Sequence, residues 1–318
     1  MHGKKKRKDV AQFLLRFSDN ILDLHKELAG KTYKHCSYHA FKINDPKPRD
    51  IHKASVRDRL IHHVIYNSLC PYFDKKFIFD SYSCRFGKGT HKAVNRFREF
   101  GRKMSKNNTK QCWILKCDVR KFFANINHDI LKCVLAKNIE DENILWLLDQ
   151  VINSFNTKGK LGVGLPLGNL TSQIFVNIYM NVFDQFMKRE LKAEFYIRYA
   201  DDFVIFSSSK LFLLDIIPKI SNFLKNSLRL ELHPNKIFLK TLTFGIDFLG
   251  WVHFPMYRVL RTTTKSRMFR RLERKFSKEV ASSYLGLLSH GNGFKLAYKI
   301  CQKSDFRRLL NSQKSGII

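Results

Sequence analysis

The N-terminal segment places hydrophobic side chains three or four positions apart, which is the spacing of one face of an α-helix. The members of this stripe are Val10, Phe13, Leu14, Phe17, Ile21, Leu24 and Leu28. Gly30 follows them and predicts the end of a single helix over residues 9–30. Residues 38–43 then alternate between polar and apolar, and residues 49–53 follow after the turn sequence NDPKP. Two strands joined by a turn are therefore predicted.

The rest of the chain alternates between short apolar runs and longer helical patterns. Ser55 and Asp58 have the spacing of a capping box, which predicts a helix start there. Further helices are predicted in three places: from Asn127 and His128, after the glycine-rich loop 161–169, and over residues 211–226. Strands are predicted at residues 111–118, on both sides of a turn within 195–206, and near Gly250 and Trp251. This order predicts an α+β fold in which a sheet carries helices on one face.

Charge is the strongest compositional signal. The chain of 318 residues has 58 Lys and Arg against 27 Asp and Glu, a formal net charge of +31. Self-repulsion of this size is tolerated most easily when the partner is a polyanion, whereas solubility alone needs a net charge of roughly 2–8 on a small domain. From residue 256 onward, 15 Lys and Arg stand against 3 acids. We therefore expect a nucleic acid partner and a basic helical subdomain at the C-terminus that faces phosphates.

Other compositional features exclude several classes of protein. The seven cysteines are scattered and no two have CxxC spacing, so neither a zinc site nor a disulfide framework is indicated. No apolar run approaches the roughly 20 residues that span a bilayer. Together with the lack of a signal peptide, this predicts a cytoplasmic protein with no membrane partner. The opening string HGKKKRK is expected to be a basic arm that contacts phosphates.

Candidate chemistry lies in the segment FYIRYADDFVIF, residues 195–206, where Asp201 and Asp202 occupy the tip of a predicted hairpin. Two like charges this close require a proton or a cation between them. Mg²⁺ prefers carboxylate oxygens and often shares its coordination with substrate phosphates. Asp118 ends the apolar run QCWILKCD and supplies a third acid from a neighbouring strand. Three such acids predict a site for two metal ions that catalyses in-line displacement at phosphorus.

Around these acids the chain resembles the reverse transcriptases. YADD at 199–202 and CDVRKFF at 117–123 resemble the two metal-binding boxes of that family. Further boxes are GLPLGNLTSQ at 164–173, HPNK at 233–236, FLGW at 248–251 and SYSCRFGKGTH at 81–91. The resemblance covers nearly the whole chain, in the family's order. It implies a right-hand polymerase fold with fingers at residues 1–111, including the basic arm, a ferredoxin-like palm at 112–255 and a helical thumb at 256–318.

The resemblance also implies a catalytic centre. Asp118, Asp201 and Asp202 would bind two Mg²⁺ ions, with Mn²⁺ as a substitute, and the backbone carbonyl of Val119 would add a ligand. Lys236, in the HPNK box, would protonate the departing pyrophosphate. The partners would be an RNA template, a primer and deoxynucleoside triphosphates.

Further residues would contact the incoming nucleotide. Phe123 matches the steric gate of the family, where a ring in the place of a ribose 2′-hydroxyl rejects ribonucleotides by clash. Because Phe122 is adjacent, one ring of the pair must point inward, and a core role for Phe123 stays open. Arg85 and Lys88 would contact the triphosphate, since an Arg fork fits phosphate oxygens. Gly168 would let the backbone approach a base closely.

The string LPLGNLTSQ narrows the resemblance to one subfamily. Ser172 and Gln173, with an apolar Leu167, resemble the reverse transcriptases of diversity-generating retroelements, which are encoded by bacteria or phages. Those enzymes copy RNA into cDNA, misincorporate opposite adenines and work with a small basic pentameric accessory protein. Leu167 and Gln173 would both border the nucleotide. Because Leu167 cannot hydrogen-bond the nucleotide as a Gln could, correct and incorrect pairs would differ less in transition-state binding.

Two alternatives stay open. The first is a group II intron-like or defence-associated reverse transcriptase, whose maturase version would bind intron RNA through the thumb. The second is a non-catalytic RNA-binding protein on the same scaffold, although the presence of all three acids and of Lys236 argues against it.

Overall fold

The computed structural model describes residues 6–44, 48–274 and 276–302 of the chain. The basic string at the N-terminus lies mostly outside these ranges. The chain divides into two compact units whose segments alternate along the sequence. Unit 1 comprises Met1–Gly87, Cys117–Phe203 and Leu214–Ile237, and unit 2 comprises Lys88–Lys116, Val204–Leu213 and Phe238–Ile318.

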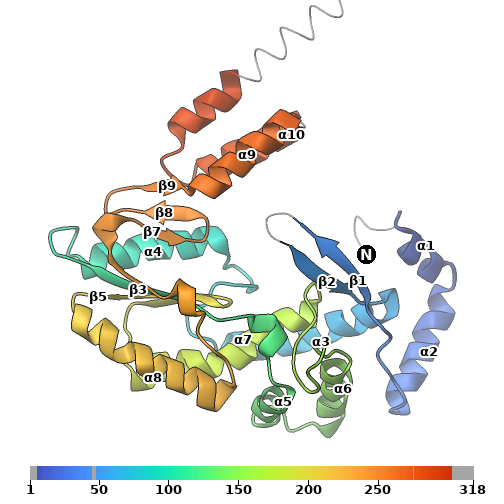
Figure 1. Ribbon diagram of the computed structural model, residues 1–318. Coiled ribbons are helices and arrows are strands. Elements are labelled where there is room, and N and C mark those ends of the chain that lie inside the picture. The colour runs from blue at the N-terminus through green and yellow to red at the C-terminus, as the bar shows by residue number, and fades with distance from the viewer. Residues whose placement is uncertain (1–5, 45–47, 275, 303–318) are drawn as a thin grey trace, which may run out of the picture. The chain divides into compact units, whose positions relative to one another are not determined.

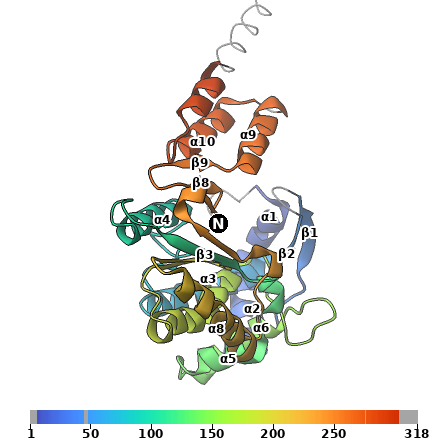
Figure 2. The same ribbon diagram turned by 60° about the vertical axis from the view of Figure 1, so that its left-hand side comes forward.

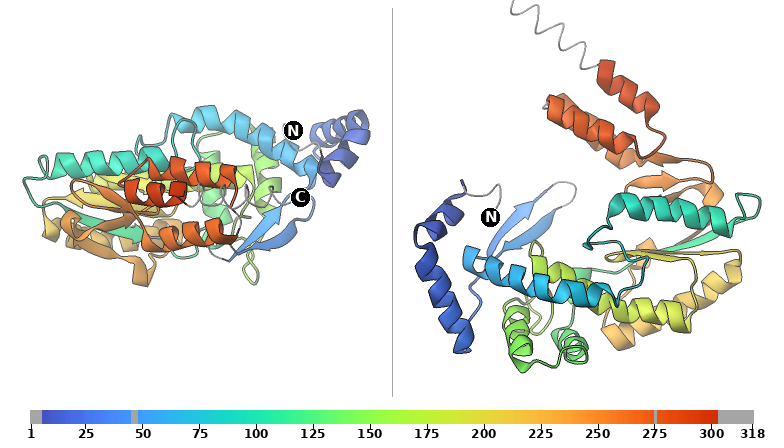
Figure 3. Two further views of the ribbon diagram at one scale, coloured as in Figure 1. Left: turned by 90° about the horizontal axis from the view of Figure 1, so that it is seen from above. Right: turned by 180° about the vertical axis from the view of Figure 1, so that it is seen from behind.

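Unit 1 is built mainly from helices (Figure 1). Its α-helices are α1 (Lys8–Leu15), α2 (Phe17–Ala29), α3 (Val56–Asp74), α5 (His128–Ala136), α6 (Glu142–Asn153), α7 (Leu170–Gln185) and the larger part of α8 (Lys210–Leu228). Short helical turns are η1 (Phe122–Asn125), η2 (Phe186–Glu190) and η3 (Pro234–Lys236), and the strands are β1 (His39–Ile43), β2 (Arg49–Lys53) and β4 (Tyr196–Tyr199). The long helix α3 packs along α7 (Figure 3), and α5 also packs against α7.

The single helix predicted over residues 9–30 is wrong, because the chain forms α1 and α2 there. Arg16 leaves the helical region with φ −123° and ψ 44°. The Asn20 side chain donates to the carbonyl of Phe13 at 2.9 Å, which satisfies one of the carbonyls left open at the end of α1. The hydrophobic spacing continues through the break, so periodicity alone could not reveal it.

Other predicted starts and turns are confirmed by their hydrogen bonds. Ser55 Oγ accepts from the backbone N–H of Asp58 at 3.1 Å and begins α3. Asn127 Oδ1 accepts from the N–H of Ile130 at 3.0 Å and begins α5. The predicted hairpin is β1 paired antiparallel with β2, with His39 opposite Lys53.

One four-stranded sheet has the order β4-β5-β3-β6, and the division between the units passes through β3 and β5. These strands are β3 (Trp113–Asp118), β5 (Asp202–Ser207) and β6 (Phe238–Thr241). β3 and β6 are antiparallel, with Trp113 opposite Thr241. The core residues of the sheet, such as Ile114 and Val204, are fully buried. The α+β prediction is confirmed.

Unit 2 contains α4 (Thr90–Met104), the turn η4 (Leu242–Phe244), a second sheet and the C-terminal helices. Its sheet is antiparallel with the order β7-β8-β9, formed by β7 (Ile246–Phe248), β8 (Trp251–His253) and β9 (Arg258–Leu260). Helices α9 (Thr262–Arg274) and α10 (Lys278–Leu288) follow (Figure 2), and residues 294–302 are also helical. Trp251 packs in one core with side chains from α4, α9 and α10.

The predicted domain boundaries at residues 111/112 and 255/256 stay a prediction, since the two units interleave along the chain and do not follow one another. Among the described ranges, no helix combines the length and the apolar character that crossing a membrane requires.

Candidate active site

Three segments of unit 1 meet at the predicted catalytic acids. The hairpin β4–β5 turns at Ala200, whose φ of +56° is left-handed, and Asp201 follows. The backbone N–H of Val119 donates to the carbonyl of Asp201 at 3.1 Å, which joins the end of β3 to this turn. The backbone N–H of His233 donates to the carbonyl of Asp118 at 2.7 Å and joins the HPNK segment to the same place. The structure therefore brings Asp118 and Asp201 together, as the sequence predicted.

Lys236 lies beside the first of these acids. Its Nζ donates to Asp118 Oδ1 at 2.8 Å, and the two side chains are 39% and 18% exposed. The turn η3 holds the lysine there, and the His233 side chain accepts from the N–H of Asn235 at its start. A pair this accessible to solvent stabilises the fold by at most about 1 kcal/mol. Its consequence is one of position, because it sets an ammonium group beside the acid cluster.

Burial and neighbouring charges together shift the pKa of the Asp201 carboxyl. Burial and the charge of Asp118 raise the pKa of the Asp201 carboxyl, while the charges of Lys236 and Arg49 oppose the rise. The shift means that burial and the neighbouring carboxylate both disfavour the ionised form of Asp201. A cation bound between the two carboxylates would relieve both effects.

The donor set fits a hard cation only in part. Asp118 and Asp201 offer carboxylate oxygens, which Mg²⁺ prefers. However, within the described ranges no group of three His, Cys, Asp or Glu side chains is arranged to hold a metal ion. Asp202 begins β5 and is partly buried, and its predicted role as a third ligand stays a prediction. The same holds for the carbonyl of Val119.

A buried ion pair lies behind the turn. Arg198 of β4 donates from Nε and Nη2 to the carboxylate of Asp184 in α7, at 2.8 and 2.7 Å, and both side chains are fully buried. Tyr196 Oη donates to the same carboxylate at 2.8 Å. Arg198 Nη1 donates to the carbonyl of Ala200 at 3.0 Å. Because Ala200 precedes Asp201, this network ties the turn that carries Asp201 to α7.

The loop before α7 is held by the hairpin β1–β2. The N–H of His52 donates to the carbonyl of Leu167 at 2.9 Å, and Asn169 Nδ2 donates to the carbonyl of His52 at 2.8 Å. Gly168 has φ +106°, and a Cβ on it would lie 2.8 Å from Ile51 Cγ2. The glycine is therefore needed for packing against β2. Its predicted approach to a base stays a prediction, and Leu167 is half-buried in the same loop.

The two adjacent phenylalanines have different environments. Phe122 is 2% exposed and belongs to the core, whereas Phe123 is only partly buried. The carbonyl of Phe123 accepts from the N–H of Leu165 at 2.8 Å, which links it to the loop before α7. The inward ring of the pair is thus Phe122, and Phe123 remains available as a steric gate.

Gln173 lies in the first turn of α7 and is partly buried. Its neighbour Thr171 is fixed by His62 of α3, since His62 Nδ1 and Thr171 Oγ1 are 2.6 Å apart. The start of α7 is therefore held from behind, and the role of Gln173 at a nucleotide stays a prediction.

Arg85 was expected from the sequence to contact a triphosphate, but in the structure its donors are occupied by other residues. Its Nε donates to Asp74 Oδ1 at 2.6 Å, and Nη1 donates to the carbonyls of Ile78 and Ser81 at 2.7 and 3.0 Å. The side chain is 6% exposed. The guanidinium group of Arg85 therefore stabilises the loop that contains it. Lys88 belongs to unit 2, and its predicted contact stays a prediction.

Arg49 is the residue of this site that sequence reasoning did not single out. It is one of several cations in residues 38–53, and in the structure its charge opposes the rise in the pKa of the Asp201 carboxyl. It is exposed at the start of β2. No signal in the sequence distinguishes Arg49, because its strand meets the loop before α7 only in the folded chain, through the hydrogen bond from His52 to Leu167.

The chain is similar to curated proteins of Escherichia coli and of yeast. Protein YkfC of Escherichia coli (strain K12) is 25% identical over 244 residues, which cover 64% of this chain and 62% of YkfC. The putative COX1/OXI3 intron 2 protein of Saccharomyces cerevisiae is 23% identical over 309 residues, which cover 78% of this chain and 33% of that protein. The chain thus spans less than two thirds of the length of these curated relatives.

Among solved structures, the apo telomerase of Candida tropicalis superposes with a TM-score of 0.60 at 13% identity, over 91% of this chain and 64% of the telomerase. A likeness at this identity concerns the fold, and it confirms the predicted right-hand polymerase fold. The family model for the reverse transcriptase (RNA-dependent DNA polymerase) matches residues 41–253, which is well over half of the chain. The chain belongs to the reverse transcriptase family.

Proposed function

We propose that this chain is an RNA-directed DNA polymerase that makes cDNA on an RNA template from a primer and deoxynucleoside triphosphates. The observation that carries the proposal is the pair Asp118 and Asp201, whose segments are joined through Val119 and whose carboxylates repel. Such a pair is suited to a divalent cation. Mg²⁺ bound there would lower the pKa of the primer 3′-hydroxyl and neutralise charge on the triphosphate.

The chain's own residues would divide the remaining work. Asp118, Asp201 and Asp202, with the carbonyl of Val119, would hold the ions. Lys236, which contacts Asp118, would supply a proton to the departing pyrophosphate. The exposed Arg49 would contact triphosphate oxygens, because a guanidinium group presents several donors in one plane.

The walls around the nucleotide would come from two linked segments. Phe123 would exclude a ribose 2′-hydroxyl by clash. Its carbonyl accepts from Leu165, in the loop that carries Leu167 and Gly168 and leads to Gln173 in α7. Because the loop is fixed by β2, the nucleotide would meet a preformed wall. Preformed walls reduce the entropy lost on binding.

Primer extension on a defined RNA template with Mg²⁺ tests the proposal. We expect Asp201→Asn to bind the primer and template as the parent does and to make no cDNA, since it removes a ligand charge and keeps the shape. Asp215→Asn is the matched control: this acid on α8 forms an exposed pair with Lys219, and the variant should extend normally. Full-length cDNA from Asp201→Asn would refute the assignment.

We further propose the diversity-generating subtype, in which the enzyme misincorporates opposite adenines and works with a small basic pentameric accessory protein. The support is the apolar Leu167, whose backbone is fixed by His52 and whose side chain offers no hydrogen bond to a nucleotide. Sequencing of cDNA made with and without the accessory protein measures the error at adenines. Leu167→Gln should lower that error, whereas Leu161→Gln, at a loop position that is 92% exposed, should not. Equal error in the parent and Leu167→Gln would contradict the subtype's explanation.

A second candidate is a reverse transcriptase that works with an intron RNA. The observation in its favour is that the yeast relative is named as an intron protein. The two candidates are separated by the same sequencing experiment. Faithful copying opposite adenine, together with tight binding to a structured intron RNA, would favour the second.

A further inference from the structure

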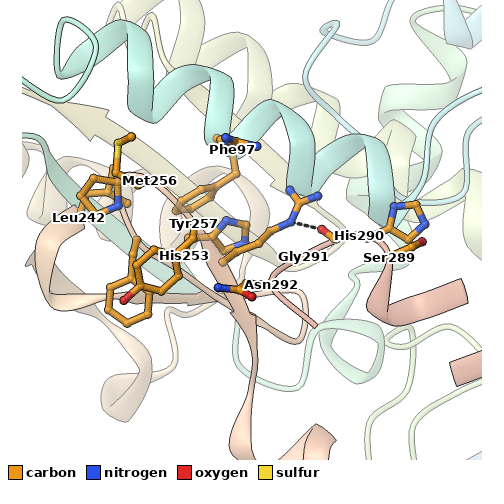
Figure 4. A pocket seen from close by; sticks show the side chains of 13 residues that line it. Phe97, Leu242, His253, Met256, Tyr257, Ser289, His290, Gly291 and Asn292 are labelled. Atoms are coloured by element: carbon orange, nitrogen blue, oxygen red, sulfur yellow. Dashed lines mark hydrogen bonds between the residues drawn. The ribbon is translucent and has the colours of Figure 1, made fainter. Parts of the chain in front are cut away.

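Unit 2 contains a cavity of about 280 Å³ that shares no residue with the acid cluster. Helix α4 forms one wall, the turn between β8 and β9 forms another, and residues 289–292 after α10 close it (Figure 4). Ligand pockets commonly measure about 300–1,000 Å³. The cavity is therefore slightly smaller than that range and suits one compact group.

The charge of the lining is one-sided. None of the described residues that line the cavity is acidic, and they include Arg98 and Arg258. Arg258 is held in place by donating to the carbonyl of Val94, to Asn95 Oδ1 and to the carbonyl of His290. Burial and the charge of Arg98 lower the pKa of Arg258. Two guanidinium groups thus face one space without a carboxylate between them, which favours an anion.

Arg98 is the arginine that a ligand could engage. It is exposed on α4, and the described part of the chain gives it no hydrogen bond or ion pair. It also lines a neighbouring groove on α4 with Arg102, while the acid of that groove, Glu99, is already paired with Arg96 and Lys103. Arg98 therefore stands where the cavity meets a second positive surface.

The rest of the lining consists of rings. Phe254 and Tyr257 are stacked in the β8–β9 turn with centroids 4.9 Å apart, and Tyr257 is 49% exposed. His253 lies against Phe97 of α4, with the ring planes tilted by 37° and the centroids 4.1 Å apart. Burial and the charge of Arg258 lower the pKa of His253 to about 3, so the ring is neutral. Flat aromatic faces with a cation at the edge match a nucleobase and its phosphate.

We propose that this cavity binds one nucleotide, with its base against the rings of the β8–β9 turn and its phosphate at Arg98. The nucleotide is either free or part of a single strand that continues along the groove at Arg102. A strand would follow the groove that Arg98 and Arg102 line, since phosphate contacts dominate the affinity for single-stranded nucleic acid. The site is separate in its residues from the catalytic acids and needs no metal ion.

Binding to the full-length chain in EDTA tests this, because chelation removes the contribution of a metal-dependent triphosphate site. The probes are the four nucleoside monophosphates, measured by calorimetry, and a fluorescent ten-nucleotide single-stranded RNA, measured by anisotropy. Arg98→Gln should weaken binding about tenfold, the loss expected for a charged hydrogen bond. Lys92→Gln removes the same charge from an exposed position of α4 outside the cavity and should have little effect.

A second pair of variants tests the rings. Tyr257→Ala should also weaken binding, by about fivefold or more, whereas Tyr298→Ala, which removes a similarly exposed ring from unit 2, should not. Loss with the monophosphates assigns the site to a free nucleotide, and loss with the RNA alone assigns it to a strand. The proposal is overturned if both pairs of variants bind both probes as the parent does. Primer extension plays no part in these measurements, so their failure leaves the proposed polymerase activity untouched.

Discussion

The substitution Asp184→Asn measures how strongly the buried ion pair with Arg198 stabilises the turn that carries Asp201. It keeps the size of the side chain and removes the charge that Arg198 meets with both Nε and Nη2. Arg198 cannot lose its proton, so an uncompensated guanidinium group would remain in a fully buried site. The hydrogen bond from Arg198 to the carbonyl of Ala200, one residue before Asp201, would then be the next contact to give way.

The magnitude follows from the burial of the pair. Removing one partner of a buried ion pair costs about 3–5 kcal/mol, which is roughly two to three and a half powers of ten in the folding equilibrium. With an m-value of about 2 kcal/mol per M in urea, the unfolding midpoint should fall by roughly 1.5–2.5 M. The same change at Asp215 loses an exposed pair with Lys219 on α8 and should cost about 0.5 kcal/mol or less.

Urea unfolding followed by circular dichroism measures the stability of both variants. Primer extension, at urea concentrations below the unfolding transition, measures how well the turn positions Asp201. Asp184→Asn should be less active than its loss of folded protein accounts for, because Asp201 is then less well positioned. Equal unfolding midpoints for the Asp184 and Asp215 variants, with normal primer extension in both, would show that the pair of Asp184 and Arg198 does not stabilise the turn that carries Asp201.

Three other predictions concern the same unit. Gly168→Ala should destabilise the protein by roughly 1–2 kcal/mol, because the backbone φ is left-handed and the new Cβ would lie 2.8 Å from Ile51 Cγ2. Adding Ile51→Ala should restore only the part of this loss that the clash causes. A double-mutant cycle in urea unfolding measures that part. Asp201→Asn should raise the melting temperature in EDTA at neutral pH, because a raised folded pKa means that the parent loses stability as pH rises through it. That gain should vanish as pH falls towards the ordinary Asp pKa of 3.8, and a gain that is independent of pH would contradict it. Burial is the chief reason that the pKa of His62 is lowered to about 4 from 6.5. The parent should therefore lose stability as pH falls through this interval. His62→Gln should lose less stability than the parent between about pH 7 and about pH 5.

Local signals in the sequence were reliable where their physics is local. The caps at Ser55 and Asn127 act within one turn of helix, and both predicted helix starts are confirmed. The hairpin that carries Asp201 was also predictable. The apolar runs on both sides of the two acids can be buried as strands only if the acids lie at the turn between them. The approach of Asp118 to that hairpin was predicted from its place at the end of a strand, and the backbone bond from Val119 confirms it.

What the sequence could not reveal depends on contacts between distant segments. Arg85 was expected to be free, and only the fold shows that Asp74 and two carbonyls occupy its donors. The charge of Arg49 acts on Asp201, and its strand is hydrogen-bonded through His52 to Leu167, more than a hundred residues later. Basic residues are so frequent in this chain that composition cannot distinguish the few that reach a site from those that only face solvent.

The alternation of the two units along the chain affects how the protein is made. The first segment of unit 2 begins at Lys88, yet the segment that completes unit 1 ends at Ile237. At roughly 5–20 residues per second, synthesis of the intervening stretch takes on the order of 10 s or more. During that time the apolar side of α4, including Val94, has left the ribosome before Trp251 exists to cover it. Nascent chains should therefore depend on chaperones over this interval, and neither unit can be produced by itself as an uninterrupted fragment.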